Sequence, residues 1–251
     1  MKLRLTPSKS FYHHYAEPIL STLEFEGLSL KEVMSRALTI SWEFSETVRT
    51  ENGVKRPGIR AQEVNAALRT AMKTSLGIGV EFEVKERNGY WEWGDKKEGF
   101  DFGLLDHVAN LYLLRNACFG SRPMHGGGSL WESYLKSNPN YARLASLHYG
   151  PLDLESSGSN VSLPVEVMPP VVGEIQFGNH ALRGVDMFRL MKAHRTSEVG
   201  LVVYIAATGR LESLLSSGIV TFDVMREFLT EFNREVNVPI WLIGLDEMEL
   251  K

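Results

Sequence analysis

The N-terminal part of the chain shows mostly helical spacing of its apolar residues. Between Ser29 and Ser45 these residues recur three and four positions apart, and Ser29 stands three residues before Glu32, as a helix N-cap does. The same spacing predicts helices at residues 60–76, 104–118 and 130–148, the last broken near Pro139. Alternation at 80–84 predicts a half-exposed strand, with residues 90–93 as its hairpin partner.

The last hundred residues alternate between strand and helix patterns. Apolar runs at 171–177, 199–206 and 238–245 predict strands, and residues 181–195 and 222–232 between them have helical spacing. The almost wholly apolar run at 199–206 is typical of a strand buried on both faces. The sequence therefore predicts an α/β fold, with a mixed central sheet flanked by helices and a helical N-terminal half.

Size and charge limit the class of protein. With 251 residues and 28.3 kDa, one domain over 1–251 is expected, with a mostly helical part at 1–150 and an α/β core at 150–248. The net charge of −4 argues against nonspecific coating of nucleic acid but is compatible with a local basic cleft. No apolar run approaches the roughly 18–20 residues that cross a bilayer, so we expect a cytoplasmic protein without a membrane partner.

Candidate chemistry lies in the run Glu174-Ile175-Gln176. Two positions apart on a strand, Glu174 and Gln176 share one face, and a buried carboxylate there needs a partner. Glu166 could approach Glu174 if Pro169-Pro170 reverses the chain. The two carboxylates, a backbone carbonyl and a phosphate oxygen would then hold one Mg²⁺. The alternative, which the spacing alone favours, is the solvent face of a half-exposed strand.

A wider similarity favours the metal site. The stretch GEIQFGNHALRGVDMF resembles the active-site strand and following helix of type II restriction endonucleases of the BglII and BstYI kind, a branch of the PD-(D/E)xK nucleases. Ser216-Ser217-Gly218-Ile219, the helix at 222–232 and the strand VPIWLIGL follow in the same order. A helix around residues 63–68 also resembles one in the group's N-terminal half. The resemblance covers roughly residues 165–245 well and 15–85 loosely, and residues 90–160 do not align with the group.

The resemblance implies a restriction-endonuclease-like core and a Mg²⁺-dependent homodimer. Such a dimer would cut both strands of double-stranded DNA at a short palindrome, without an organic cofactor. Glu174 would be the metal-binding glutamate, and the backbone carbonyl of Ile175 would be a further ligand. Gln176 would replace the usual lysine, its carbonyl oxygen orienting a water and its amide donating to phosphate.

The first acid departs from the family's pattern. The group places an aspartate followed by phenylalanine nine residues before the glutamate, where this chain has Val165. Glu166 is the first choice as a substitute, and Asp153 is the second. Asp101 is the third, because it requires a long insertion.

The resemblance also indicates residues for DNA recognition. Asn179, Ser216 and Ser217 match positions that point into the major groove, where Asn and Ser can bond base edges. For the Ser216–Gly218 run, the alternative is an N-cap before the helix at Phe222.

Basic residues of the helix at 181–195 have two readings. They could contact phosphate or form a solvated face: Arg183, Arg189, Lys192 and Arg195.

Two other functions remain open at the level of sequence. One is a different nuclease of the same superfamily, and the other is a non-cleaving DNA-binding protein on a degenerate nuclease core.

Overall fold

The computed structural model describes residues 1–25, 27–51, 54–94, 99–148, 158–163, 167–178, 183–197 and 199–248. Among them an eight-stranded mixed sheet has the order β4-β1-β12-β11-β10-β9-β7-β8. Its parallel pairs are β10 with β11 and β11 with β12, whereas β9 joins β10 antiparallel. The bounds of its strands are β1 Lys2–His13, β4 Ile40–Glu43, β7 Val80–Arg87, β8 Tyr90–Glu92, β9 Phe100–Leu104, β10 Val171–Gln176, β11 Leu201–Ala207 and β12 Ile240–Glu247.

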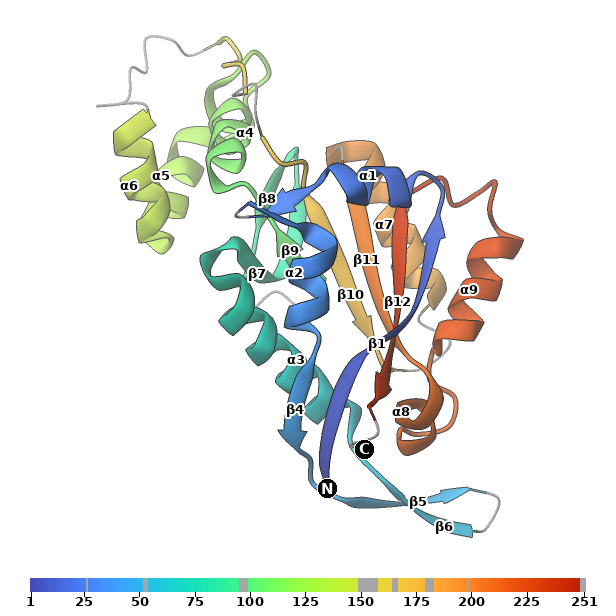
Figure 1. Cartoon of the computed structure of the whole chain (residues 1–251). Coiled ribbons are helices and arrows are strands. Elements are labelled where there is room, and N and C mark those ends of the chain that lie inside the picture. The colour runs from blue at the N-terminus through green and yellow to red at the C-terminus, as the bar shows by residue number, and fades with distance from the viewer. Residues whose placement is uncertain are drawn as a thin grey trace.

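Helices cover both faces of this sheet (Figure 1). On one face, α1, α2, α3 and α8 contribute to a core that includes Ile175 and Phe102. On the other face, α7 and α9 pack over a core that includes Val172 and Tyr204. The helices are α1 Ala16–Thr22, α2 Leu30–Ala37, α3 Ala61–Leu76, α4 His107–Phe119, α5 Gly127–Ser137, α6 Pro139–His148, α7 Arg183–Ser197, α8 Gly209–Leu214, α9 Phe222–Glu231 and the 3-10 helix η1 Gly77–Gly79.

Two small two-stranded ribbons and a third apolar cluster complete the described part of the structure. The ribbons are β2 (Glu24–Phe25) with β3 (Leu28–Ser29) and β5 (Thr47–Glu51) with β6 (Val54–Gly58). The β5–β6 ribbon projects from the end of the molecule at which β10 and β12 finish (Figure 1). Helices α4, α5 and α6 form a third apolar cluster with Tyr90 of β8.

The structure confirms the predicted α/β class and most C-terminal elements. Strands β10, β11 and β12 fall where the apolar runs predicted them, and every residue of β11 is buried. The predicted hairpin of β7 and β8 forms across Asn88 and Gly89, and both have positive φ. Ser29 caps α2 by accepting a hydrogen bond from the Glu32 N–H at 3.2 Å. The helix prediction at 130–148 is also confirmed, with the break at Pro139 between α5 and α6.

The N-terminal half contains more strand than the sequence predicted. Its longest missed element is β1, which contains Pro7, a residue type that is uncommon within strands. Pro7 is tolerated because β4 pairs only with Lys2–Leu5, so no strand needs a Pro7 N–H on that side. A register shift between Pro7 and Lys9 also bends β1 where it pairs with β12.

Two further predicted boundaries were wrong. Gly53 and Pro57 in the sequence predict a polar turn over residues 49–58, but most of these residues form the β5–β6 ribbon. The predicted helix at 104–118 begins only at His107, where Asp106 caps it by accepting from the Ala109 N–H at 2.9 Å. The preceding residues form β9, a strand that the sequence analysis missed.

No helix among the described residues has the length and apolar character needed to cross a bilayer.

Candidate active site

Glu174 lies in the middle of the sheet, on β10 between β9 and β11. Glu174 is only 5% exposed, and it stands among apolar residues in a buried strand. The alternative of a half-exposed strand with Glu174 facing solvent is therefore wrong. A carboxylate buried in this way needs charged or polar partners to offset its desolvation.

Asp101 of β9 lies beside Glu174. Phe102 pairs with Gly173 in the antiparallel register, which places the preceding Asp101 next to the following Glu174. Gly173 permits this close approach, because a Cβ there would meet the Phe102 ring at 2.0 Å. Asp101 Oδ2 accepts a hydrogen bond from the Ile175 N–H at 2.7 Å, which ties the two strands together at the site.

Asp101 also fits the pattern that the resemblance predicted, since it is followed by Phe102. Its third rank in the sequence analysis reflected the long insertion, and 74 residues do separate Asp101 from Ile175. Much of that insertion is α4, α5 and α6. Asp101 is the candidate for the first acid that the described fold brings to Glu174.

Other predicted residues lie outside the part of the chain that the structure describes. These are the two acids ranked above Asp101, and one proposed base-reading residue: Glu166, Asp153 and Asn179.

Gln176 is held by hydrogen bonds at both ends of its amide. Its Nε2 donates to Asp186 Oδ2 at 2.7 Å, and its Oε1 accepts from the Gly178 N–H at 2.9 Å. Tyr204 Oη donates to the same Asp186 oxygen at 3.3 Å. These bonds define which end of the amide is nitrogen, and each end keeps capacity for one further bond.

Arg189 reaches into the site from α7. Its Nη1 donates to Glu174 Oε1 at 2.6 Å and to the Gly99 carbonyl at 3.0 Å. The sequence analysis gave Arg189 two readings, phosphate contact or a solvated face. The structure pairs it with the buried carboxylate, so the reading of a solvated face is wrong for Arg189.

Burial and mutual repulsion make the charged form of the carboxylates at this site unfavourable. Burial raises the pKa of Glu174 well above its usual value, as does nearby Asp101, whereas Arg189 opposes the rise. Burial also raises the pKa of Asp186, against the hydrogen bond from Gln176 and the charge of Arg189. A cation between Glu174 and Asp101 would relieve this repulsion.

The donor set fits a hard divalent cation such as Mg²⁺. Glu174 and Asp101 provide carboxylate oxygens. Ile175 adjoins both residues, because it follows Glu174 in the chain and its N–H donates to Asp101. In the described ranges, no group of three or more His, Cys, Asp or Glu is arranged to hold a metal ion. Mg²⁺ commonly binds one or two carboxylates and completes its shell with phosphate and water, so two carboxylates suffice.

Ser216 and Ser217 lie on an exposed loop between α8 and α9. The alternative of an N-cap by this run is wrong, because Thr221 caps α9 by accepting from the Val224 N–H at 3.3 Å. The loop borders a hollow of about 370 Å³ that Arg49 and Arg56 of the β5–β6 ribbon also line.

This loop is connected to the end of the active-site strand. The Val220 N–H donates to the Gly178 carbonyl at 3.1 Å. Gly178 is also the residue whose N–H binds Gln176. The loop and the site therefore lie at the same end of β10.

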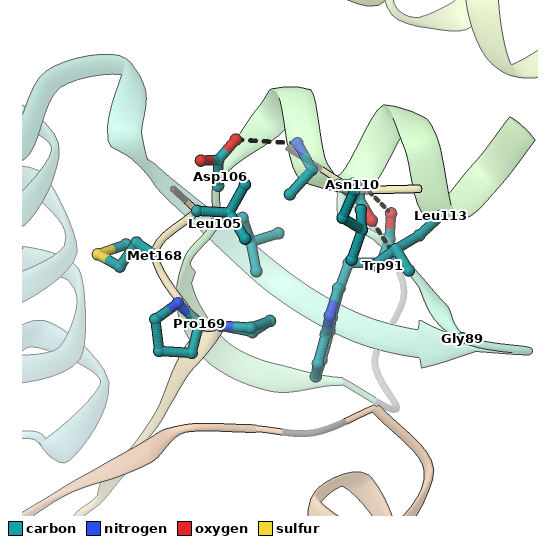
Figure 2. A pocket seen from close by; sticks show the side chains of 12 residues that line it. Gly89, Trp91, Leu105, Asp106, Asn110, Leu113, Met168 and Pro169 are labelled. Carbon is teal, nitrogen blue, oxygen red and sulfur yellow. Dashed lines mark hydrogen bonds between the residues drawn. The ribbon is translucent and has the colours of Figure 1, made fainter. Parts of the chain in front are cut away.

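A separate pocket of about 450 Å³ lies where the chain enters β10 (Figure 2). Its wall is mainly apolar and includes Trp91, Leu105 and Met168. Its polar side chains already serve the fold. Asp106 caps α4, and Asn110 bonds both the N–H and the carbonyl of Trp91. This pocket therefore offers no arrangement for catalysis.

Comparison with known proteins shows what part of this chain is similar to. Residues 156–245 match the family model described as restriction endonuclease BglII/BglIII. The match covers less than half of the chain, and it confirms the resemblance to type II site-specific endonucleases that the sequence predicted.

The chain is also distantly similar to solved structures. The crystal structure of restriction endonuclease BglII complexed with a DNA 16-mer has a TM-score of 0.47 and 12% identity, covering 97% of this chain and 79% of that chain. No curated protein sequence matches the chain.

Proposed function

We propose, on the premise that this is a type II restriction endonuclease of the BglII kind, that it hydrolyses both strands of duplex DNA at a short palindrome and depends on Mg²⁺. The observation that carries the proposal is the convergence of Asp101 and Glu174, from strands far apart in sequence, on one buried position. Paired acids of this kind are suited to holding a cation against a phosphate oxygen. We place this activity in the cytoplasm, where incoming DNA would be cut.

Each residue of the site has a role in this proposal. Glu174 and Asp101 would hold the cation, with the carbonyl of Ile175 as a further ligand. A bound Mg²⁺ would neutralise charge on the scissile phosphate and make a nearby water a better nucleophile. Gln176 would use the remaining capacity of its amide to orient that water and to donate to phosphate.

Cleavage of plasmid DNA tests this function. Purified protein is incubated with unmethylated plasmids of known, varied sequence, with Mg²⁺ or with a chelator. We expect discrete fragments with Mg²⁺ and intact DNA with the chelator. Bound but intact DNA in Mg²⁺ would contradict the proposal and favour a non-cleaving DNA-binding protein, whereas a smear would favour a nuclease without a fixed site.

We further propose that the hollow beside Ser216 and Ser217 receives DNA. Arg49 and Arg56 stand directly opposite each other in the β5–β6 ribbon and line this hollow. Arg49 also donates to the Leu215 carbonyl, which ties the ribbon to the loop that carries the two serines. Two arginines that line one hollow would attract a DNA phosphate. The two serines could then bond base edges from the same wall.

Replacing Arg56 by alanine tests this surface. We expect weaker duplex binding on every sequence, and a salt dependence whose slope falls by about one, since one phosphate contact is lost. Arg122→Ala, on the exposed loop after α4, is the matched control. Equal affinity and slope in the Arg56 variant and the control would exclude Arg56 from the interface.

We also propose that the protein acts as a homodimer through α7. Two apolar side chains one helical turn apart are exposed on this helix, Val185 at 55% and Phe188 at 74%. A second copy of the same helix would cover them, and a two-fold dimer matches the symmetry of a palindromic site.

Phe188→Asp is expected to convert the dimer into a monomer. A charge in the centre of an apolar interface loses its hydration without gaining a partner. Analytical ultracentrifugation measures the change, and Leu147→Asp on α6, where Leu147 is 72% exposed, is the control. A dimer that persists with Phe188→Asp would place the interface elsewhere.

A further inference from the structure

The active-site strand lacks the positive charge that its kind of motif usually carries. Gln176 stands where a lysine is usual, and its amide is neutral. A phosphoryl-transfer site benefits from a fixed positive charge beside the developing negative charge. A cation near Glu174 that comes from outside the strand could take this place.

Helix α7 provides such a cation from outside the strand. Asp186 and Arg189 are one turn apart on this helix, and they contact the two polar residues of the motif separately. Asp186 binds Gln176 at 2.7 Å, and Arg189 binds Glu174 at 2.6 Å. The bond from Arg189 to the Gly99 carbonyl at 3.0 Å also fixes its guanidinium against the start of β9.

The geometry leaves Arg189 able to act on a bound phosphate. Its bonds to other described residues use Nη1, so Nη2 and Nε keep their donors for a ligand. Its partner on the glutamate is Oε1, which leaves Oε2 for a cation. A phosphate that shares a cation with Glu174 must lie within a few ångströms of this guanidinium.

We propose that Arg189 supplies the positive charge that the strand's motif lacks. Asp186 complements it by holding Gln176, so that the amide stays in one orientation beside the charge. The inference rests on the proposed function, because it assumes that a phosphodiester is hydrolysed at Glu174. Arg189 is not a metal ligand, and its guanidinium repels a cation while it attracts the phosphate.

A charge-relocation experiment tests the proposal. Arg189→Met is expected to lower kcat for DNA cleavage about a hundredfold, as loss of one transition-state donor does, with little change in KM. Arg189→Lys is expected to keep most of the activity, because the charge remains. In Gln176→Lys/Arg189→Met the charge moves to the strand, and we expect at least a tenfold recovery over Arg189→Met.

Mn²⁺ binding, measured from the signal of free Mn²⁺ without turnover, provides a second readout. Because Arg189 repels a cation, the Arg189→Met variant is expected to bind Mn²⁺ at least as tightly as the unchanged protein. Weaker binding would show that Arg189 only holds the metal-binding carboxylate in place, which would overturn the proposal. Arg195→Met, an exposed position further along α7, is the charge-matched control, and thermal unfolding checks that each variant folds.

The two possible failures give different results. If the unchanged protein leaves DNA intact in Mg²⁺, the proposed function fails. If the unchanged protein cuts and Arg189→Met cuts equally well, or if the double variant shows no recovery, the function stands and the role of Arg189 is wrong.

Discussion

Replacing Glu174 by glutamine is expected to abolish DNA cleavage while leaving duplex binding nearly unchanged. The substitution keeps the shape of the side chain but removes the charge that would hold the cation. Because the cation contributes several kcal/mol to the transition state, the rate should fall by at least about a thousandfold. Single-turnover cleavage and gel-shift binding in Ca²⁺ measure the two effects separately.

Glu227→Gln is the matched control for this substitution, because Glu227 is exposed on α9. The unfolding transition of each variant shows whether the fold survives. Glu174 is nearly buried and pairs with Arg189, so its replacement could also affect folding. A variant that folds but no longer cuts shows that Glu174 acts in the reaction. A folded Glu174→Gln variant that cuts at the normal rate would remove Glu174 from the reaction.

Asp101→Asn is expected to cause a loss nearly as large. Asparagine can still accept the hydrogen bond from the Ile175 N–H, so the two strands stay joined. It loses the charge that would hold the cation together with Glu174 and that pairs with Arg69 at 2.8 Å. We expect a rate reduced at least about a hundredfold, measured as single-turnover cleavage.

Glu166→Gln and Asp153→Asn form the comparison for Asp101. If Asp101 is the first acid, each of these variants keeps its cleavage rate within a few-fold of the unchanged protein. The opposite result, with Asp101→Asn active and Glu166→Gln inactive, would assign the metal site to Glu166.

The C-terminal fold could be predicted because its signals are local. Strands β11 and β12 are apolar runs buried on both faces, and α9 has an apolar stripe of helical period. Glu174 and Gln176 stood out as two polar residues within such a run, but the spacing alone favoured a solvent-facing strand, and the resemblance was needed to select them as site residues.

Asp101 ranked low because its position depends on long-range pairing. The sequence shows an acid between Phe100 and Phe102, but not that β9 would pair with β10. Helices α4, α5 and α6 lie between the two strands in sequence. The Asp-Phe pair was the one available signal, and greater weight on it than on spacing would have selected Asp101.

The role of Arg189 could not be predicted, because helical periodicity does not show which residues a charged helix face contacts. Val185 and Phe188 suggested an inward apolar face, yet both are exposed. Met187 and Leu190 are the buried residues instead, and Arg189 beside them points to Glu174. The partners of α7 decide its orientation, and they come from distant parts of the chain.

Sequencing of the fragment ends tests the central claim most directly. Unmethylated plasmids of known sequence are digested in Mg²⁺, and the ends are read on both strands. We expect every end to fall at a fixed position within one short palindrome, with symmetric cuts on the two strands, and no end to arise with Glu174→Gln. Ends scattered over unrelated sequences, cuts confined to one strand, or the same ends with Glu174→Gln would contradict this claim.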